Sequence, residues 1–156
     1  MQTLLPLPSF KQTASCLSDR DLKQQQIDVC ELMDTFHDVE DPKPRGWPID
    51  HPVIDMWIGH EPQLCEYGLE MCEEWKARGH ESEHFEQLIW HLECATSGDF
   101  LLTKPRWFGD MKFHNSHQSL LLRNNKEHYQ QFFPNTSSTI PVVWPKSRDN
   151  YDLEKD

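Results

Sequence analysis

The stretch Leu17–Met33, L-S-D-R-D-L-K-Q-Q-Q-I-D-V-C-E-L-M, predicts one amphipathic helix around which the chain is organised. Leu22, Val29 and Met33 recur at helical spacing, and Phe36 continues the same apolar stripe beyond the quoted stretch. A helix with such a stripe buries it against other elements. We therefore expect a helix over residues 19–36 that lies across the core.

The polar side of this helix carries a carboxylate among glutamines. Ser18 or Asp19 can cap its first turn. Successive helix residues are turned by about 100°, so at most two of the side chains in Gln24–Gln26 can face outward together. At least one amide is expected to point toward the core or a cleft, close to Asp28.

Outside this stretch, the pattern predicts further helices and almost no strand. Pro6 and Pro8 keep residues 1–8 extended. A short helix capped by Ser9 is expected first, and another helix begins at residue 51. Further helices are expected over residues 62–78, 82–95 and 126–133, with one more, capped at Asn115 or Ser116, before the last. Loops are expected around Pro42–Pro48 and at 97–99. The fold class is all-α, a compact single-domain helical bundle over 1–145 with an extended N-terminal segment and a charged C-terminal tail over 146–156.

Length and composition favour a single domain in a reducing compartment. The 156 residues suit one core, and no apolar run approaches the roughly 20 residues that span a bilayer. The first residues lack the pattern of a signal peptide. Five cysteines, an odd number without C-x-x-C spacing, indicate reduced thiols. We expect a monomer that does not associate with a membrane. Its expected location is the cytoplasm, either at the bacterial nucleoid or, if the protein is phage-encoded, in the cytoplasm of the host.

The charge is unevenly distributed. A formal net charge of -11 argues against attraction of nucleic acid by the whole surface. In segment 104–126, however, Lys104, Arg106, Lys112, Arg123 and Lys126 face a single acidic residue, Asp110. A local basic site therefore remains compatible with the composition.

Three segments together resemble the pyrimidine-dimer DNA glycosylase family of the phage endonuclease V type. They are L-P-L-P-S-F-K-Q-T-A-S-C-L-S-D-R-D-L-K-Q-Q-Q-I-D, then H-P-V-I-D-M-W-I-G-H-E-P-Q-L-C-E-Y with E-W-K-A-R-G, and P-R-W-F-G-D-M-K-F-H-N-S-H-Q-S-L-L-L-R with the V-W-P tail. They cover more than half of the chain in the family's order.

The resemblance implies a mechanism without a metal or other cofactor. In the family, the N-terminal α-amine attacks the sugar C1′ of the damaged nucleotide and displaces the base, and β-elimination then cuts the strand. An α-amine has a pKa near 7.7–8.0, so a useful fraction is unprotonated at neutral pH. On the register of L-S-D-R-D-L, Asp28 falls at the family's catalytic carboxylate. The helix and the chain's start would then form the reactive site together.

This sequence departs from the family at three points. Asp28 stands where the family's usual residue is Glu, and residues corresponding to phosphate-contacting arginines are Ile27 and Glu31. Gln2 is bulky, and Met1 is normally retained before such a residue. The amine would therefore belong to Met1, unless processing exposes Gln2.

The resemblance also suggests residues that contact double-stranded DNA with a damaged or modified pyrimidine. Three of them lie on the first long helix, and the others lie in the basic segment: Arg20, Lys23, Gln24, Arg106, Trp107, His114, Ser116, His117 and Arg123. The alternatives are a solvated helix face for the first three, a loop anchor for Trp107, and capping or core roles for Ser116, His117 and Arg123.

Two further interpretations stay open. A related enzyme could act on hypermodified thymine bases in phage-like DNA, or the chain could be a non-catalytic DNA- or protein-binding module. The pairs His114/His117 and His80/His84 have spacings that suit a metal, but neither has an evident third ligand. We therefore predict no metal site.

Overall fold

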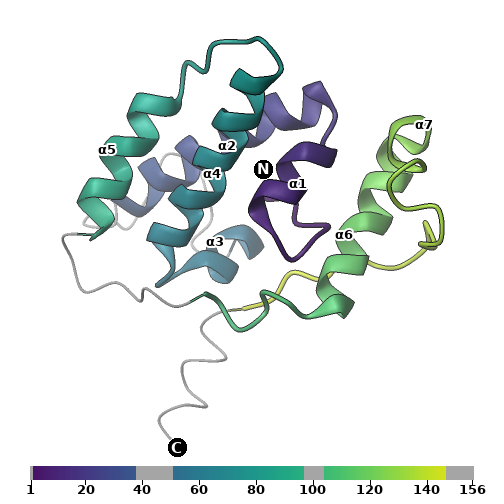
Figure 1. Cartoon of the computed structure of the whole chain (residues 1–156). Helices are drawn as coiled ribbons and strands as arrows, with labels where there is room; N and C mark the ends of the chain where they lie inside the picture. The colour runs from purple at the N-terminus through teal and green to yellow at the C-terminus, as the bar shows by residue number, and fades with distance from the viewer. Residues whose placement is uncertain (1, 38–50, 97–103, 147–156) are drawn as a thin grey trace, which may run out of the picture.

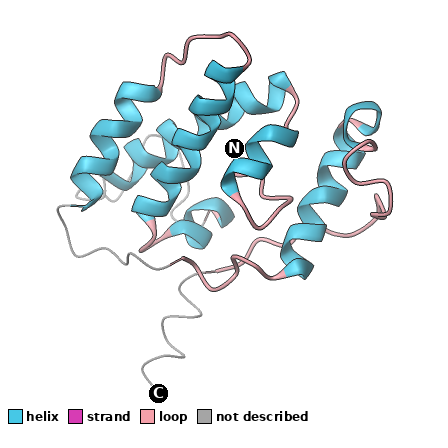
Figure 2. Cartoon of the chain, in the orientation of Figure 1, coloured by secondary structure: helices cyan, strands magenta, loops and turns pink. Residues whose placement is uncertain are grey.

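The computed structural model describes residues 2–37, 51–96 and 104–146. Within these ranges every regular element is a helix, as Figure 2 shows, and no strand is present. The predicted all-α class is confirmed. Met1, the loop around Pro42–Pro48, the turn at 97–99 and most of the tail at 146–156 lie outside the described residues.

Seven helices form over the described residues. They are α1 (Phe10–Cys16), α2 (Asp19–His37), α3 (Pro52–Trp57), α4 (Glu61–Ala77), α5 (Phe85–Thr96), α6 (Met111–Asn124) and α7 (Lys126–Tyr129). The predicted Ser9 cap is confirmed, because its side chain accepts the N–H of Gln12. The predicted cap of α6 at Asn115 or Ser116 was wrong, since Asp110 caps the helix five or six residues earlier. The last helix ends at Tyr129 rather than at Phe133.

The helices form two groups with the N-terminal part of the chain between them. In Figure 1, α2, α4 and α5 lie on one side, α6 and α7 lie on the other, and α1 runs between them. Helix α4 contacts α1, α2 and α5. The apolar stripe of α2 faces this arrangement, with Leu22, Val29 and Met33 fully buried.

Gly68 allows α2, α4 and α5 to approach one another closely. A Cβ added at Gly68 would lie 2.8 Å from Val29 Cγ1 and 2.9 Å from Leu88 Cδ1. Val29 comes from α2 and Leu88 from α5, so the missing side chain sets the distance among three helices.

Gly68→Ala is expected to destabilise the protein, because the added methyl group overpacks this junction. Overpacking costs about 1–3 kcal/mol, whereas alanine recovers only about 0.5–1 kcal/mol of helix propensity. Thermal unfolding should show a Tm lower by a few degrees. Glu66→Ala, at an exposed position of the same helix, is the control and should change stability by less than about 0.5 kcal/mol. An unchanged or raised Tm for Gly68→Ala would contradict this account.

Residues 3–6, in the non-helical segment before α1, are buried, and side chains supply the partners of their backbone. Gln25 of α2 accepts the N–H of Leu4 (2.9 Å) and donates to the carbonyl oxygen of Gln2 (3.1 Å). Tyr67 of α4 donates to the carbonyl oxygen of Leu4 (2.8 Å). Buried backbone polar groups need such partners. The Gln25 side chain thus supplies hydrogen bonds that a neighbouring strand would provide in a sheet.

Helix α6 holds the other side of the same segment. His117 Nδ1 accepts the N–H of Leu5 (3.1 Å), and His114 Nδ1 donates to the carbonyl oxygen of Leu5 (2.7 Å). Gln118 donates to the carbonyl oxygen of Pro6 (2.9 Å). Through these bonds, the start of the chain is fixed between α2 and α6, beside Asp28.

Candidate functional site

A polar cleft of about 670 Å³ opens beside Asp28. This volume lies within the range of about 300–1,000 Å³ that is usual for small-molecule sites. The lining residues come from the chain's start, the segment around the first half of α2, and the end of α6: Gln2, Ser18, Arg20, Asp21, Gln24, Asp28, Asn124 and Asn125. Four of the residues predicted from the sequence, namely Gln2, Arg20, Gln24 and Asp28, therefore share one cleft.

The Asp28 carboxylate lies next to the chain's start. Asp28 is 2% exposed, and its Oδ2 accepts the backbone N–H of Gln2 at 3.4 Å. Its Oδ1 accepts an N–H of the Gln24 side chain at 2.8 Å. Burial raises the pKa of Asp28, and the bonds from Gln24 and Gln2 and the positive charge of the amino terminus oppose that rise. A carboxylate with a raised pKa is a stronger base, as proton transfer at neutral pH requires.

The three consecutive glutamines have three separate roles. Gln24 is exposed and orients Asp28, whereas Gln25 holds the N-terminal segment. Gln26 accepts the hydroxyl of Ser82 at 2.8 Å and thereby joins α2 to the segment before α5. The helical geometry required at least one amide inside, and two are buried.

A second carboxylate in the cleft is held by the C-terminal part of the chain. Tyr129 of α7 is fully buried, and its hydroxyl donates to Asp21 Oδ2 (2.5 Å) and accepts the N–H of Ser18 (3.0 Å). Burial is the main cause that raises the pKa of Tyr129, so this hydroxyl remains a donor. Asp21 and the Asn124–Asn125 pair were not predicted as site residues. The pair is visible in the sequence only as an interruption between two helices.

Four predicted DNA contacts do not fit their positions in the structure. Trp107 is 4% exposed and donates to the carbonyl oxygen of Met56, and His114, Ser116 and His117 are fully buried. The histidines bind the backbone of the N-terminal segment. Ser116 accepts the N–H of Val143 at 3.0 Å and so fastens the extended C-terminal segment. Buried side chains with satisfied hydrogen bonds offer no surface to DNA, so these residues have structural roles.

His117 is expected to make stability depend on pH. Burial lowers the pKa of His117 from 6.5 to about 4. The unfolded chain therefore binds more protons than the folded chain between these values, and the free energy of unfolding falls as the pH drops from 6.5 toward 4.

His117→Gln should remove this part of the pH dependence. Tm measured from pH 7 to pH 4 should fall less steeply for the variant than for the wild type, whatever the variant's Tm at pH 7. Using the difference between the two curves cancels the opposite contributions of Asp28 and Glu61, whose pKa values are raised by burial. Parallel curves would show that His117 does not titrate as described.

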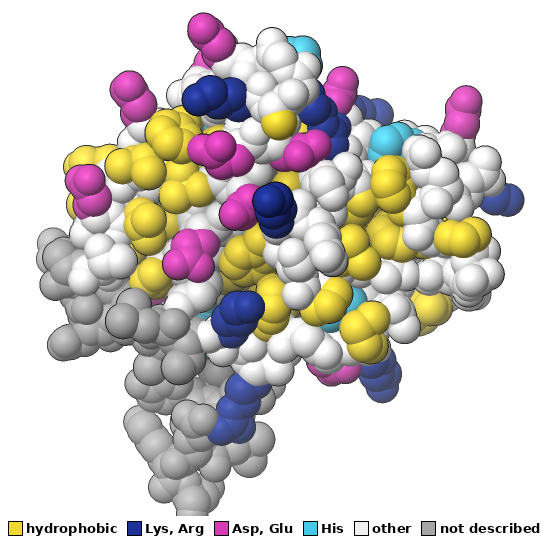
Figure 3. All heavy atoms as spheres, in the orientation of Figure 1, with side chains coloured by type: hydrophobic (Ala, Val, Ile, Leu, Met, Phe, Trp, Pro, Cys, Tyr) yellow, Lys and Arg dark blue, Asp and Glu magenta, His cyan; other side chains and the backbone are white. Residues whose placement is uncertain are grey.

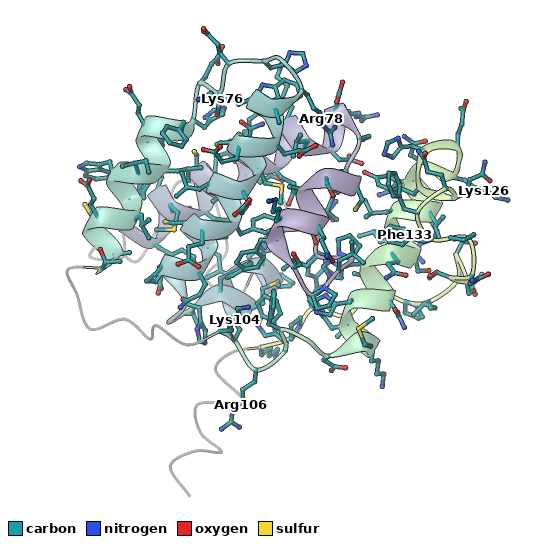
Figure 4. All side chains as sticks on the ribbon, in the orientation of Figure 1. Lys76, Arg78, Lys104, Arg106, Lys126 and Phe133 are labelled. Carbon is teal, nitrogen blue, oxygen red and sulfur yellow. The ribbon has the colours of Figure 1, made fainter. Side chains whose placement is uncertain are left out.

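The remaining predicted DNA contacts lie at the surface. Arg20 and Lys23 are exposed on α2, and Arg106 points away from the helices in Figure 4. The Arg123 guanidinium donates to Ser119 and to the carbonyl oxygens of Ser138 and Ile140, so it holds the C-terminal segment onto α6. Acidic and basic side chains are interspersed on the face shown in Figure 3. That face thus carries no large patch of one sign.

Two further classes of site are absent from the described ranges. No group of three or more His, Cys, Asp or Glu side chains there is arranged to hold a metal ion. No helix there combines the length and apolar character that crossing a membrane needs.

Comparison with known families identifies the family of the chain. The family model described as pyrimidine dimer DNA glycosylase matches residues 1–87. The chain belongs to this family. The matched part contains Gln2, Arg20, Gln24 and Asp28, whereas α6, α7 and their Asn124–Asn125 pair lie beyond it. Searches of curated proteins and of solved structures found no match. Membership implies that the substrate is DNA and the activity that of a pyrimidine dimer DNA glycosylase.

Proposed function

We propose that this protein is a DNA glycosylase with linked abasic-site lyase activity on a damaged or modified pyrimidine. Its nucleophile is the α-amine at the start of the chain, and its assisting carboxylate is Asp28. The observation that carries this proposal is the 3.4 Å distance between the Gln2 nitrogen and Asp28 Oδ2 at the edge of an open cleft.

The reaction uses the two groups in sequence. The amine nitrogen forms a bond to C1′ of the nucleotide. The glycosidic bond between C1′ and the base nitrogen breaks, and its electron pair leaves with the base. The nitrogen then loses a proton, and the C1′–O4′ bond breaks with its electron pair going to O4′, which takes up a proton, so that an iminium joins chain and sugar. Removal of a C2′ proton breaks the C3′–O3′ bond, and water finally hydrolyses the imine. Lysine is a poorer nucleophile for this step, since its unperturbed pKa is near 10.4.

Asp28 has two tasks in this scheme. Its negative charge stabilises the oxocarbenium character that develops on the sugar, and a partly buried site strengthens that interaction. Asp28 also accepts and returns protons. Burial raises its pKa toward neutral pH, which favours this proton transfer. Gln24 holds the Asp28 Oδ1 atom, which leaves Oδ2 facing the chain's start.

Cations for the phosphate backbone are available beside the cleft. Arg20 lines it, and Lys23 is exposed one turn further along the same helix. We propose that these two side chains contact the phosphates flanking the target nucleotide. Phosphate contacts of this kind position DNA without reading its sequence.

Trapping with borohydride tests the proposal. The protein is incubated with a duplex that carries one thymine dimer, a duplex that carries one abasic site, and an undamaged duplex. A reduced adduct on the first two, mapped by mass spectrometry to the N-terminal peptide, is the expected result. Absence of an adduct on both damaged duplexes, or an adduct on a lysine, would overturn it.

A further inference from the structure

We infer that Gln25 is a positioning residue for the reaction, because its side chain and that of Asp28 hold the two ends of residue 2 and so determine where the chain's amine lies. This inference rests on the proposed function and extends it to how the nucleophile is held. Gln25 is 1% exposed and does not line the cleft, so it offers no surface to DNA and acts through the chain's start.

The backbone of residue 2 is held at both ends by one face of α2. Gln25 Nε2 donates to the carbonyl oxygen of Gln2 at 3.1 Å, and the N–H of Gln2 donates to Asp28 Oδ2 at 3.4 Å. Gln25 and Asp28 are three residues apart, so they lie on the same face of the helix, about 4.5 Å apart along its axis. One helix therefore carries both the carboxylate and the group that positions the amine relative to it.

The bond to the Gln2 carbonyl oxygen restricts the movement of the Gln2 nitrogen. The peptide unit between Gln2 and Thr3 is planar, and beyond it Trp57 Nε1 donates to Thr3 Oγ1 at 2.8 Å. Holding the oxygen of this planar unit therefore also restrains the Gln2 Cα atom. The nitrogen keeps the rotation about the Cα–C bond, and the bond to Asp28 selects one setting of that rotation. The reacting amine belongs to residue 2 or to the residue before it, so the restraint acts on either.

The Gln25 side chain is itself held in one orientation. Its Oε1 accepts the N–H of Leu4 at 2.9 Å and lies 2.6 Å from the Tyr67 hydroxyl, which is shared with the carbonyl oxygen of Leu4. These contacts occupy the amide oxygen and leave Nε2 directed at Gln2. A buried polar network whose members all have partners is rigid. The position of residue 2 is thus inherited from the packing of α2 against α4.

Gln26 offers a matched control on the same helix. It is 2% exposed, and its amide donates to the carbonyl oxygen of Leu22 and accepts the hydroxyl of Ser82, so it does not hold the chain's start. Gln25→Met and Gln26→Met each replace a buried amide by an unbranched apolar side chain. Thermal unfolding should show a lower Tm for both, because each loses buried hydrogen bonds. Tyr67→Phe is a second test variant, since it removes one hydroxyl from the contact that orients Gln25.

Trapping kinetics measure the effect on the nucleophile. Each protein is mixed with an excess of the abasic-site duplex or the thymine-dimer duplex at several concentrations, and cyanoborohydride reduces the imine so that each protein molecule is trapped once. We expect Gln25→Met to lower the maximal rate constant by about ten- to a hundredfold, because a misplacement of about 1 Å costs about 10² in rate. Tyr67→Phe should lower it less. Gln26→Met should match the wild type, and the duplex concentration that gives half the maximal rate should be the same for all four proteins.

The final yield of adduct separates positioning from loss of folded protein. An unfolded fraction lowers the yield and leaves the rate constant of the folded molecules unchanged. A displaced amine lowers the rate constant and leaves the yield unchanged, which is the result expected for Gln25→Met.

The inference and the proposed function fail in different ways. An unchanged rate constant for Gln25→Met, or equal slowing by Gln25→Met and Gln26→Met, overturns the inference alone. If Gln25→Met does not fold, an unchanged rate constant for Tyr67→Phe overturns it. A wild-type protein that forms no adduct on either duplex, or forms it on a lysine, refutes the proposed function and the inference with it. Slowing at full yield by Gln25→Met or Tyr67→Phe, with Gln26→Met at the wild-type rate, supports both.

Discussion

Asp28→Asn is expected to slow cleavage of the glycosidic bond and of the strand by about 10²–10⁴-fold while the protein remains folded. The asparagine has nearly the same shape but carries no charge for the developing cation and cannot accept a proton. Single-turnover cleavage of the dimer and abasic-site duplexes measures the loss, and borohydride trapping shows whether the imine still forms. Activity within about threefold of the wild type would remove Asp28 from the mechanism.

The stability of the same variant distinguishes a catalytic carboxylate from a structural one. Burial raises the folded-state pKa of Asp28. Its contribution to stability is therefore greatest at low pH and is lost as the pH rises through that pKa. Asparagine does not ionise, so the Tm of the variant minus that of the wild type should become more positive as the pH rises from below 3.8 toward neutrality. A structural carboxylate would give the opposite trend.

Asp28→Glu is the matched control for charge. It keeps the carboxylate and restores the longer side chain that is usual in the family. We expect at least a tenth of the wild-type rate, because the negative charge remains beside the chain's start. If Asp28→Glu and Asp28→Asn lost activity equally, the shape of the site rather than its charge would explain the loss.

The main helix was predictable because its pattern is local. The apolar stripe of Leu22, Val29 and Met33 has the helical period, and acidic residues in the first turn complement the helix dipole. The predicted bounds of 19–36 therefore differ from the observed α2 by one residue. The carboxylate at Asp28 was placed by the same register, together with the family resemblance.

The interior polar residues were not predictable in the same way. His114 and His117 are buried because an extended segment far away in the sequence needs hydrogen-bond partners, and a local pattern does not contain that requirement. The family resemblance suggested DNA contacts for both residues, with a capping or core role as the alternative for His117. Asn124 and Asn125 were missed for a related reason. Their place in the cleft depends on how α6 packs against the N-terminal segment, which the helical period does not determine.

Gln2→Thr is expected to raise the rate of the reaction by about a hundredfold, because the substitution determines which residue's amine lies beside Asp28. Methionine is normally retained before glutamine and removed before a small residue such as threonine. The Gln2 nitrogen lies 3.4 Å from Asp28 Oδ2, so an amine at this position lies beside the assisting carboxylate. With Met1 removed, the free amine takes this position, and activity should rise relative to the chain that keeps Met1.

Two further measurements establish which residue begins each protein and whether the position of its amine matters. Intact mass shows whether Met1 is present in each protein. An extension of Ser-Gly-Ser before Met1 moves the amine further away and should abolish trapping, and proteolytic removal of the extension should restore it. Consecutive Cα atoms are about 3.8 Å apart, so a one-residue shift of the amine exceeds the misplacement of about 1 Å that already costs about 10² in rate. If Gln2→Thr lowered the activity while Met1 was removed, the working amine would belong to Met1. If the extended chain trapped DNA as well as the native one, no terminal amine would be the nucleophile.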